Sequence, residues 1–253
     1  MSQSKSTLLL EHHLKHLKLP TMAREYTSLA EVCAKDRSDY PEYLLRLAER
    51  ELLNRERKSV ERRLKDARFP VPKTVDSFDF TSQASVNEQL YRELLRGAYI
   101  DAHENVLFIG NSGTGKTHMA TALGFAACAQ GRRVRFYGVT ALVTELLEAR
   151  ETRRLERLMV QLTRNHLLIL DELGYVPFSK VGAELLFDVV SRAYERQSLA
   201  VTTNLPFENW VEVMGSERLT GALLDRLTHR VHIIEANGES YRLRQAKKRA
   251  KKN

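Results

Sequence analysis

The stretch LFIGNSGTGKTH, residues 107–118, decides the fold class of this chain. It contains Gly110, four further residues, and then Gly115, Lys116 and Thr117, which completes the phosphate-loop pattern G-x-x-x-x-G-K-[ST]. The apolar run before this loop predicts a β-strand, and the residues after it predict a helix. The loop is therefore expected where a strand meets a helix N-terminus, so that backbone N–H groups and the helix dipole face a phosphate group.

The residue types of the loop suit a nucleotide. Its glycines allow the backbone to wrap phosphates where a Cβ would collide, Lys116 reaches the β and γ oxygens, and the Thr117 hydroxyl ligates Mg²⁺. A glycine-rich turn that arose by chance is the alternative interpretation. The candidate nucleotide-binding residues are Gly110, Asn111, Ser112, Gly113, Thr114, Gly115, Lys116, Thr117 and His118.

Two acidic residues follow the apolar run in HLLILDEL, residues 166–173. A phosphate loop needs an acid that orients the metal and a group that positions water. We assign the first role to Asp171, with Mg²⁺ as the metal, and the second to Glu172 as the general base. The alternative is an ordinary helix N-cap with an acid in the first turn.

Polar residues also end the run SLAVTTN, residues 198–204. Hydroxyl and amide groups at the carboxyl edge of a buried parallel strand lie where ligands bind in open α/β folds. Asn204 is therefore a candidate for positioning the attacking water beside the γ-phosphate. Together with Leu205 and Pro206, it is also a good turn opener.

Two arginines lie near the end of a predicted helix in LLDRLTHR, before the last apolar run. Arg226 or Arg230 would act as an arginine finger on the nucleotide of a neighbouring subunit. A salt bridge to Asp225, or a cationic helix C-cap, explains Arg226 equally well.

The wider pattern predicts an α/β domain that follows a helical one. Apolar residues recur at helical spacing from residue 6 to 68, and Pro20 opens the second helix. The prolines of RFPVPKTVDSFDF then break this pattern. Beyond them, the runs NVLFIG, RVRFYGV, HLLILDEL, SLAVTTN and VHIIEA alternate with helices, which indicates a parallel sheet covered on both faces. We expect a helical domain over residues 1–68, a linker over 69–80, an ATPase domain over 81–240 and a basic tail over 241–253.

Length and charge narrow the class of protein. A chain of 253 residues accommodates one or two domains, and a formal net charge of +8 favours polyanionic partners. Cys33 and Cys128 lie far apart, so neither a disulfide framework nor a paired metal motif is expected. Charged residues interrupt the N-terminal apolar stretch, and no run has the length of a membrane span. We therefore expect a soluble, cytoplasmic protein without a membrane partner.

The combined motifs resemble AAA+ ATPases, and within them the initiator-type IstB and DnaC group. The match is closest to the IstB family of helper ATPases in insertion-sequence transposition. The resemblance implies an AAA+ core with a five-stranded sheet in the order 5-1-4-3-2, ATP as nucleotide, and homo-oligomers with composite ATPase sites. It also implies binding to duplex DNA and to a transposase of the IstA type, in a bacterial protein that associates with the nucleoid when bound to DNA. The residues that carry the resemblance are GNSGTGKTH, LLILDELGYVPF, AVTTNLPFENW, LLDRLTHR and FPVPKTVDSFDF.

One feature departs from most AAA+ proteins. Fewer than 20 residues follow VHIIEA, so the helical lid with its second sensor arginine is expected to be lacking. Arg242 and Arg244 are therefore not assigned as sensors.

Two helical segments, TALVTELLEAR and TRRLERLMVQLTR, join the second and third predicted strands where one helix would suffice. In initiator-type AAA+ proteins an inserted helix here lines the DNA channel. We therefore assign DNA binding to Arg150, Arg153, Arg154 and Arg157, with Arg164 nearby, and expect Leu155, Leu158, Val160 and Leu162 to pack inward. In the alternative interpretation this is a solvated face whose arginines are neutralised by Glu151 and Glu156. Other candidate DNA sites are Arg55, Arg57, Lys58, Arg62 and Arg63, and the tail with Lys247, Lys248, Arg249, Lys251 and Lys252.

The favoured function is a DNA-binding ATPase that assembles on duplex DNA with ATP and recruits or stimulates a transposase for DNA recombination. A loader of a replicative helicase, which would grip its partner through the helical N-terminus, stays open as the alternative. A small-molecule kinase is disfavoured because no acceptor-binding domain is evident. A signalling GTPase is disfavoured because no Asn-Lys-x-Asp segment follows the loop.

Overall fold

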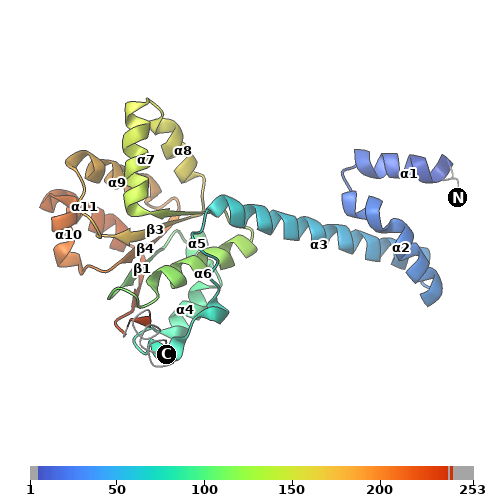
Figure 1. Ribbon diagram of the computed structural model, residues 1–253, viewed down its shortest axis with the longest axis horizontal. Helices are drawn as coiled ribbons and strands as arrows, with labels where there is room; N and C mark the ends of the chain where they lie inside the picture. The colour runs from blue at the N-terminus through green and yellow to red at the C-terminus, as the bar shows by residue number, and fades with distance from the viewer. Residues whose placement is uncertain (1–4, 239, 242–253) are drawn as a thin grey trace, which may run out of the picture. The chain divides into compact units, whose positions relative to one another are not determined.

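The computed structural model describes residues 5–238, 240 and 241 of the chain. Figure 1 shows their helices and strands, which form two compact units that divide between Arg62 and Arg63, inside one long helix. This division precedes residues 69–80, the linker predicted from the sequence, and the predicted domain boundaries stay a prediction. The expected basic tail, including Arg242, Arg244 and its lysines, lies outside the described residues apart from Tyr241.

The first unit contains helices joined by short turns in its described residues, and no strand, as expected. It contains α1 (Lys5–His16), α2 (Pro20–Asp36) and most of α3 (Tyr40–Ala67). The proline that opens α2 stands at the first helical position, where its missing N–H costs no hydrogen bond. A small apolar core holds the unit together and is formed by Leu29, Cys33 and Leu47.

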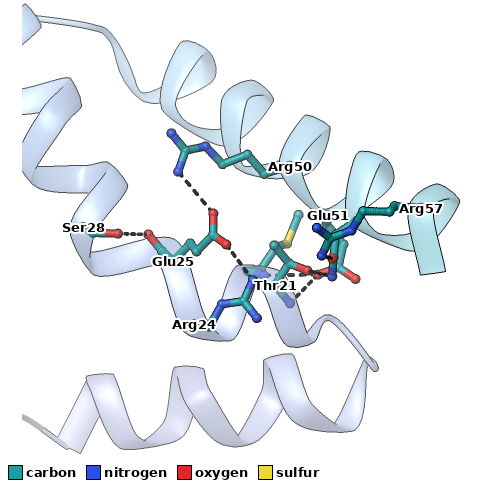
Figure 2. Close-up of polar contacts among 9 residues, drawn as sticks. Thr21, Arg24, Glu25, Ser28, Arg50, Glu51 and Arg57 are labelled. Atoms are coloured by element: carbon teal, nitrogen blue, oxygen red, sulfur yellow. Dashed lines mark hydrogen bonds and ion pairs between the residues drawn. The ribbon is translucent and has the colours of Figure 1, made fainter. Parts of the chain in front are cut away.

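A carboxylate from α3 caps the N-terminus of α2. The Glu51 side chain is only 3% exposed and accepts hydrogen bonds from the backbone N–H groups of Thr21 at 2.7 Å and Met22 at 3.1 Å. Arg55 donates to the other Glu51 oxygen at 2.8 Å. Figure 2 shows Glu51 beside Thr21. Because Leu19 at the N-cap offers no side-chain bond, Glu51 supplies the acceptor that this helix end lacks.

The second unit is built on a sheet whose five strands all pair in parallel. The strand order is β2-β3-β4-β1-β5, which is the predicted order 5-1-4-3-2 viewed from the other edge. All five apolar runs identified in the sequence form strands, as predicted. These strands are β1 (Asn105–Ile109), β2 (Val134–Gly138), β3 (Leu167–Leu173), β4 (Ser198–Thr203) and β5 (Val231–Glu235).

Helices cover both faces of the sheet, as Figure 1 shows for α7 and α9 on one side and for α4 and α6 on the other. Alternate residues of β3 point into the two apolar layers: Leu168 and Leu170 into one, Leu167 and Ile169 into the other. This double burial is why the strands are continuously apolar. The first layer packs α7 (Val139–Glu151), α8 (Leu155–Thr163), α9 (Lys180–Ala193), α10 (Trp210–Met214) and α11 (Glu217–Thr228). The second packs α4 (Glu88–Leu94), α5 (Ala98–Asp101) and α6 (Lys116–Ala129).

Short 3₁₀ turns complete the unit. They are η1 (Val75–Ser77), η2 (Phe80–Ser82) and η3 (Phe207–Asn209). The described residues after β5 form no helical lid, and residues 242–253, which the expectation of a missing lid also concerns, lie outside the described part. Both cysteines are buried and free. Within the described part of the chain, we find no helix with the length and apolar character of a membrane span.

The two helices predicted between the second and third strands are present as α7 and α8. Leu158 and Leu162 are buried in the core and Leu155 packs against it, as expected. The inward position expected for Val160 is wrong, since its side chain is 40% exposed. Residues two apart on an α-helix are separated by roughly 200°. Val160 therefore faces away from the core that Leu158 and Leu162 enter.

Candidate nucleotide-binding site

The phosphate loop joins β1 to the N-terminus of α6, as its sequence context predicts. Gly115 is the N-cap of α6, with a φ of 97° that favours glycine. A Cβ on Gly115 would lie 2.6 Å from the Phe78 ring, and one on Gly110 would lie 2.1 Å from the Ala236 carbonyl oxygen. Both glycines are thus required by backbone conformation and by close packing.

The loop holds its own lysine close to the backbone. Lys116 is 9% exposed, and its Nζ donates to the carbonyl oxygens of Gly110 and Asn111, each at 2.7 Å. These bonds hold the ammonium group inside the loop, where its charge also acts on Asp171. A desolvated ammonium beside a ring of backbone N–H groups suits phosphate oxygens.

Asp171 and Thr117 meet across the sheet edge. The Thr117 hydroxyl lies 2.9 Å from Asp171 Oδ1 and 3.1 Å from Oδ2, and the Thr202 hydroxyl donates to Oδ1 at 2.6 Å. Burial raises the pKa of the Asp171 carboxyl, while the hydrogen bonds from Thr202 and Thr117 oppose this shift. A carboxylate and a hydroxyl oxygen placed together form a donor set that suits Mg²⁺.

Glu172 is exposed beside the buried Asp171 because the strand is irregular there. Strand β3 continues to Leu173, so the two acids lie within the strand and not at a helix N-terminus. The pairing of β3 with β4 shifts register between Leu170 and Leu173, and Glu172 has a φ of 62°. Its backbone N–H donates to the Thr202 hydroxyl at 2.9 Å. The bulge therefore directs consecutive carboxylates into different environments.

Asn204 is exposed and follows directly after β4, which pairs with both β3 and β1. It thus lies at the sheet edge that carries the phosphate loop and the two acids. The turn after β4 is held by its neighbour, because Thr203 Oγ1 accepts from the Leu205 N–H at 3.1 Å. The Asn204 side chain is accordingly not needed to open this turn.

The structure does not bring Arg226 or Arg230 into contact with the phosphate loop of the same chain. Arg226 stacks on the Phe187 ring at 4.6 Å and donates to the Ala222 carbonyl oxygen at 3.0 Å. Arg230 is exposed and lies 3.4 Å from the Ala102 carbonyl oxygen. Among the described residues, no ion pair joins Arg226 to Asp225. The sequence-based alternative of an internal salt bridge therefore has no support.

Sequence reasoning missed a segment that packs on the loop. His118 Nε2 lies 2.9 Å from the Thr74 carbonyl oxygen, and the His118 ring contacts Phe78 edge to face. Burial lowers the pKa of His118, which favours the neutral ring. Phe78 belongs to FPVPKTVDSFDF, a stretch interpreted above as a linker only. Its closely spaced phenylalanines were the available signal of a buried contact.

A second segment after β5 also packs on the loop. The Ala236 N–H donates to Ile109 O at 2.8 Å, and the Tyr241 N–H donates to Gly113 O at 2.9 Å. No periodicity in the sequence marks this contact.

The candidate DNA-binding arginines lie where α7 ends and α8 begins. All four, Arg150, Arg153, Arg154 and Arg157, are exposed. Glu156, one of the two suggested neutralising acids, pairs instead with Arg192 of α9 at 2.8 Å. In the part of the chain that the structure describes, no acid forms an ion pair with any of these four arginines. Glu151, the other suggested acid, is exposed in the same stretch, so the four arginines form a positive cluster that no ion pair neutralises. By contrast, Arg55 is engaged by Glu51, and Arg63 donates to the Cys128 carbonyl oxygen.

Comparison with known proteins assigns the chain to a family. Residues 12–250 match the family model described as IstB-like ATP binding protein. The chain belongs to this family. The IstB-like chain is 40% identical over 239 residues to an insertion sequence IS21 putative ATP-binding protein of Pseudomonas aeruginosa, covering 94% of the chain and 90% of the relative.

Solved structures agree on the fold of this IstB-like chain. It is similar to AMPPCP-bound DnaA from Aquifex aeolicus, with a TM-score of 0.57, 18% identity, and coverage of 74% of the chain and 57% of that protein. It is also similar to the DnaC helicase loader, with a TM-score of 0.52, 19% identity, and coverage of 69% and 99%. At these identities the likeness shows a shared fold, and nothing about partners.

Proposed function

We propose that this chain is an ATPase that assembles on duplex DNA in its ATP-bound form and recruits or stimulates a transposase. One observation carries the proposal. At the carboxyl edge of the sheet, the phosphate-loop hydroxyl of Thr117 lies 2.9 Å from the buried Asp171 carboxylate, with the exposed Glu172 next to it. Membership of the IstB-like ATP binding family identifies the nucleotide as ATP.

In this proposal the loop N–H groups and Lys116 bind the ATP phosphates. Thr117 and Asp171 would hold Mg²⁺, which when bound neutralises charge on the phosphate oxygens. Asp171 is suited to this role because its buried carboxylate gains from a neighbouring cation. The two hydroxyl donors already orient it.

Hydrolysis requires a base that is free of the metal. Glu172 is exposed at the same edge, and its backbone is fixed by the bond to Thr202, so its carboxylate would polarise the attacking water. Asn204, at the end of the adjacent strand, would orient that water beside the γ-phosphate.

The ATPase site would be completed by a second subunit. Within one chain, neither Arg226, which belongs to α11, nor Arg230, which lies between α11 and β5, hydrogen-bonds to the phosphate loop, and part of each guanidinium stays available. An arginine supplied in trans would make hydrolysis depend on assembly.

Duplex DNA is the proposed scaffold for that assembly. The four exposed arginines around α7 and α8 would contact backbone phosphates, which gives binding with little sequence preference. The bound protein would then be found with the bacterial nucleoid.

The family favours a transposase as partner over a replicative helicase. The 40% identical relative is described as belonging to an insertion sequence, whereas the DnaC helicase loader shares only the fold at 19% identity. The helicase-loader alternative remains the second candidate because the catalytic residues serve either partner equally.

A pull-down with immobilised chain tests this choice. The Glu172→Gln variant, loaded with ATP on duplex DNA, is offered an IstA-type transposase and a replicative helicase in parallel. Lys116→Ala is the matched control that cannot bind the nucleotide. Retention of the transposase by Glu172→Gln alone supports the proposal. Retention of the helicase in its place would establish the loader function.

A further inference from the structure

The second unit contains a cavity of about 350 Å³ away from the nucleotide site. It lies beside the start of edge strand β2, whereas the phosphate loop follows the carboxyl end of β1. Four arginines and two acids line it, and we name it the arginine pocket. These residues are Arg63, Asp66, Arg68, Arg133, Arg135 and Glu145.

The pocket holds its arginines in place and leaves donors available. Arg135 donates to the Asp66 carbonyl oxygen at 2.9 Å and stacks on Tyr137, with 5.0 Å to the ring centroid. Arg133 uses its Nε to bind the Arg164 carbonyl oxygen at 2.7 Å. A guanidinium carries five N–H donors, so both groups retain donors that can turn toward the cavity.

The acids of the pocket do not neutralise these arginines. Among the described residues, neither Asp66 nor Glu145 forms an ion pair with Arg68, Arg133 or Arg135. Positive guanidinium groups that line one cavity and are not ion-paired with its acids repel one another and attract an anion. Their forked geometry suits the oxygens of a phosphate group.

The surroundings of the pocket favour DNA as the source of that phosphate. Gln161 of α8 and Asn165 just after it line the pocket. One turn before Gln161, on the same helical face, stands Arg157 of the proposed DNA-binding cluster. The polar face of α8 therefore connects that cluster with the pocket, and DNA lying along this helix would pass over both.

We propose that the arginine pocket binds a backbone phosphate of duplex DNA and extends the contact made by the α7 and α8 arginines. This rests on the proposed DNA-binding function. A phosphate held in a recess by several arginines fixes the path of the duplex more firmly than exposed side chains do. The pocket is thus a positioning contact for the DNA backbone.

The test measures the affinity for a fluorescent duplex against salt, with the full chain and a nonhydrolysable ATP analogue. Arg68→Ala, Arg133→Ala and their double variant are compared with wild type. Arg96→Ala is the matched control, since Arg96 is equally exposed but lies in the loop between α4 and α5. Each lost phosphate contact should reduce the log-log salt slope by about 0.9, with the slope of Arg96→Ala unchanged.

The outcomes separate this proposal from the function on which it rests. Unchanged slopes for both pocket variants, with a reduced slope for Arg157→Ala, overturn the pocket alone. Failure of the wild type to bind duplex overturns both. A thermal melting scan with inorganic phosphate is the second measurement. If phosphate raises the melting temperature of the wild type but not of the double variant, and the salt slopes of duplex binding are unchanged, the pocket binds free phosphate and the DNA proposal is overturned. Loss of assembly at an unchanged salt slope would make the pocket a protein interface, and also overturns the proposal.

Arg68 makes no side-chain hydrogen bond to the described residues, so its variant remains informative if Arg133→Ala unfolds.

Discussion

Thr202 links the two acids of the nucleotide site through a single hydroxyl group. It donates to Asp171 Oδ1 at 2.6 Å and accepts from the Glu172 N–H at 2.9 Å. Replacing it with valine keeps the shape but leaves a buried carboxylate and a backbone N–H without this partner. We expect Thr202→Val to lower kcat by roughly 10- to 150-fold, because a lost bond to a charged group costs about 1.5–3 kcal/mol.

Steady-state ATPase rates and nucleotide affinity check this prediction. Thr202→Ser restores the hydroxyl and should recover most of the rate. A wild-type kcat in Thr202→Val would exclude Thr202 as a positioning residue.

Lys116 and Glu172 should separate binding from hydrolysis. Lys116 is held inside the phosphate loop by its bond to the Gly110 carbonyl oxygen, whereas Glu172 is exposed at the edge of the sheet. Lys116→Ala is expected to lose ATP binding. Glu172→Gln should bind ATP and accumulate as the ATP-bound oligomer, with turnover down by roughly 100-fold or more. Nucleotide-binding and phosphate-release assays measure the two effects. Glu184→Gln, which changes an exposed glutamate on α9, is the control and should leave both unchanged. Full turnover in Glu172→Gln removes this residue from the mechanism.

The stability of the N-terminus of α2 depends on Glu51, a residue of α3. Burial opposes ionisation of Glu51, but hydrogen bonds from Arg55, Met22 and Thr21 outweigh it and lower the pKa of this carboxyl below its ordinary value of 4.5. A lowered folded pKa means that the carboxylate stabilises the unit above pH 4.5, and that this stability is lost as the pH falls through the folded value.

Glu51→Gln should therefore destabilise the first unit at neutral pH by about 1–3 kcal/mol. Hydrogen exchange at the Thr21 and Met22 amides measures this in the full chain, where faster exchange is expected. Glu49→Gln, two residues earlier on α3 and exposed, is the control. Equal protection in both variants across neutral and acidic pH would show that the cap adds no stability.

The junction of α7 and α8 carries the main DNA prediction. Arg153→Ala, Arg154→Ala and Arg157→Ala should each reduce the salt slope of duplex binding by about 0.9 and weaken binding to all sequences alike. Fluorescence anisotropy at several salt concentrations measures the slopes, with ATP binding as a check on folding. Three unchanged slopes would move the DNA site to the arginines near Arg55 or to the basic tail.

For the whole molecule, hydrolysis is expected to require two subunits. Arg226→Ala or Arg230→Ala should lower turnover by roughly 1,000-fold or more if the residue is the arginine finger. Mixing Arg226→Ala with Lys116→Ala should then restore part of the rate, because each subunit supplies the group that the other lacks. The ATPase rate of the mixture is compared with that of each variant alone. If assembled mixtures recover no rate for either arginine, the composite site is wrong.

The sequence by itself determined the phosphate loop, the five strands and the acids beside them. These features are local: a strand is recognised by its apolar run, and the polar residues that follow successive parallel strands meet at one edge of the sheet. That is why the sequence alone predicted that Lys116, Asp171 and Asn204 lie at one edge of the sheet. The strand order came from the family resemblance.

Only the tertiary structure decided which side chains meet across the chain. The bond from Thr202 to Glu172, the Glu51 cap on α2 and the packing of Phe78 on the loop join residues far apart in sequence, and no periodicity encodes them. The exposure of Val160 likewise followed from the orientation of α8 on the core. The arginine pocket exists because the end of α3, the start of β2 and α8 converge on one volume. A local pattern specifies an element and its apolar face, but packing specifies which faces touch.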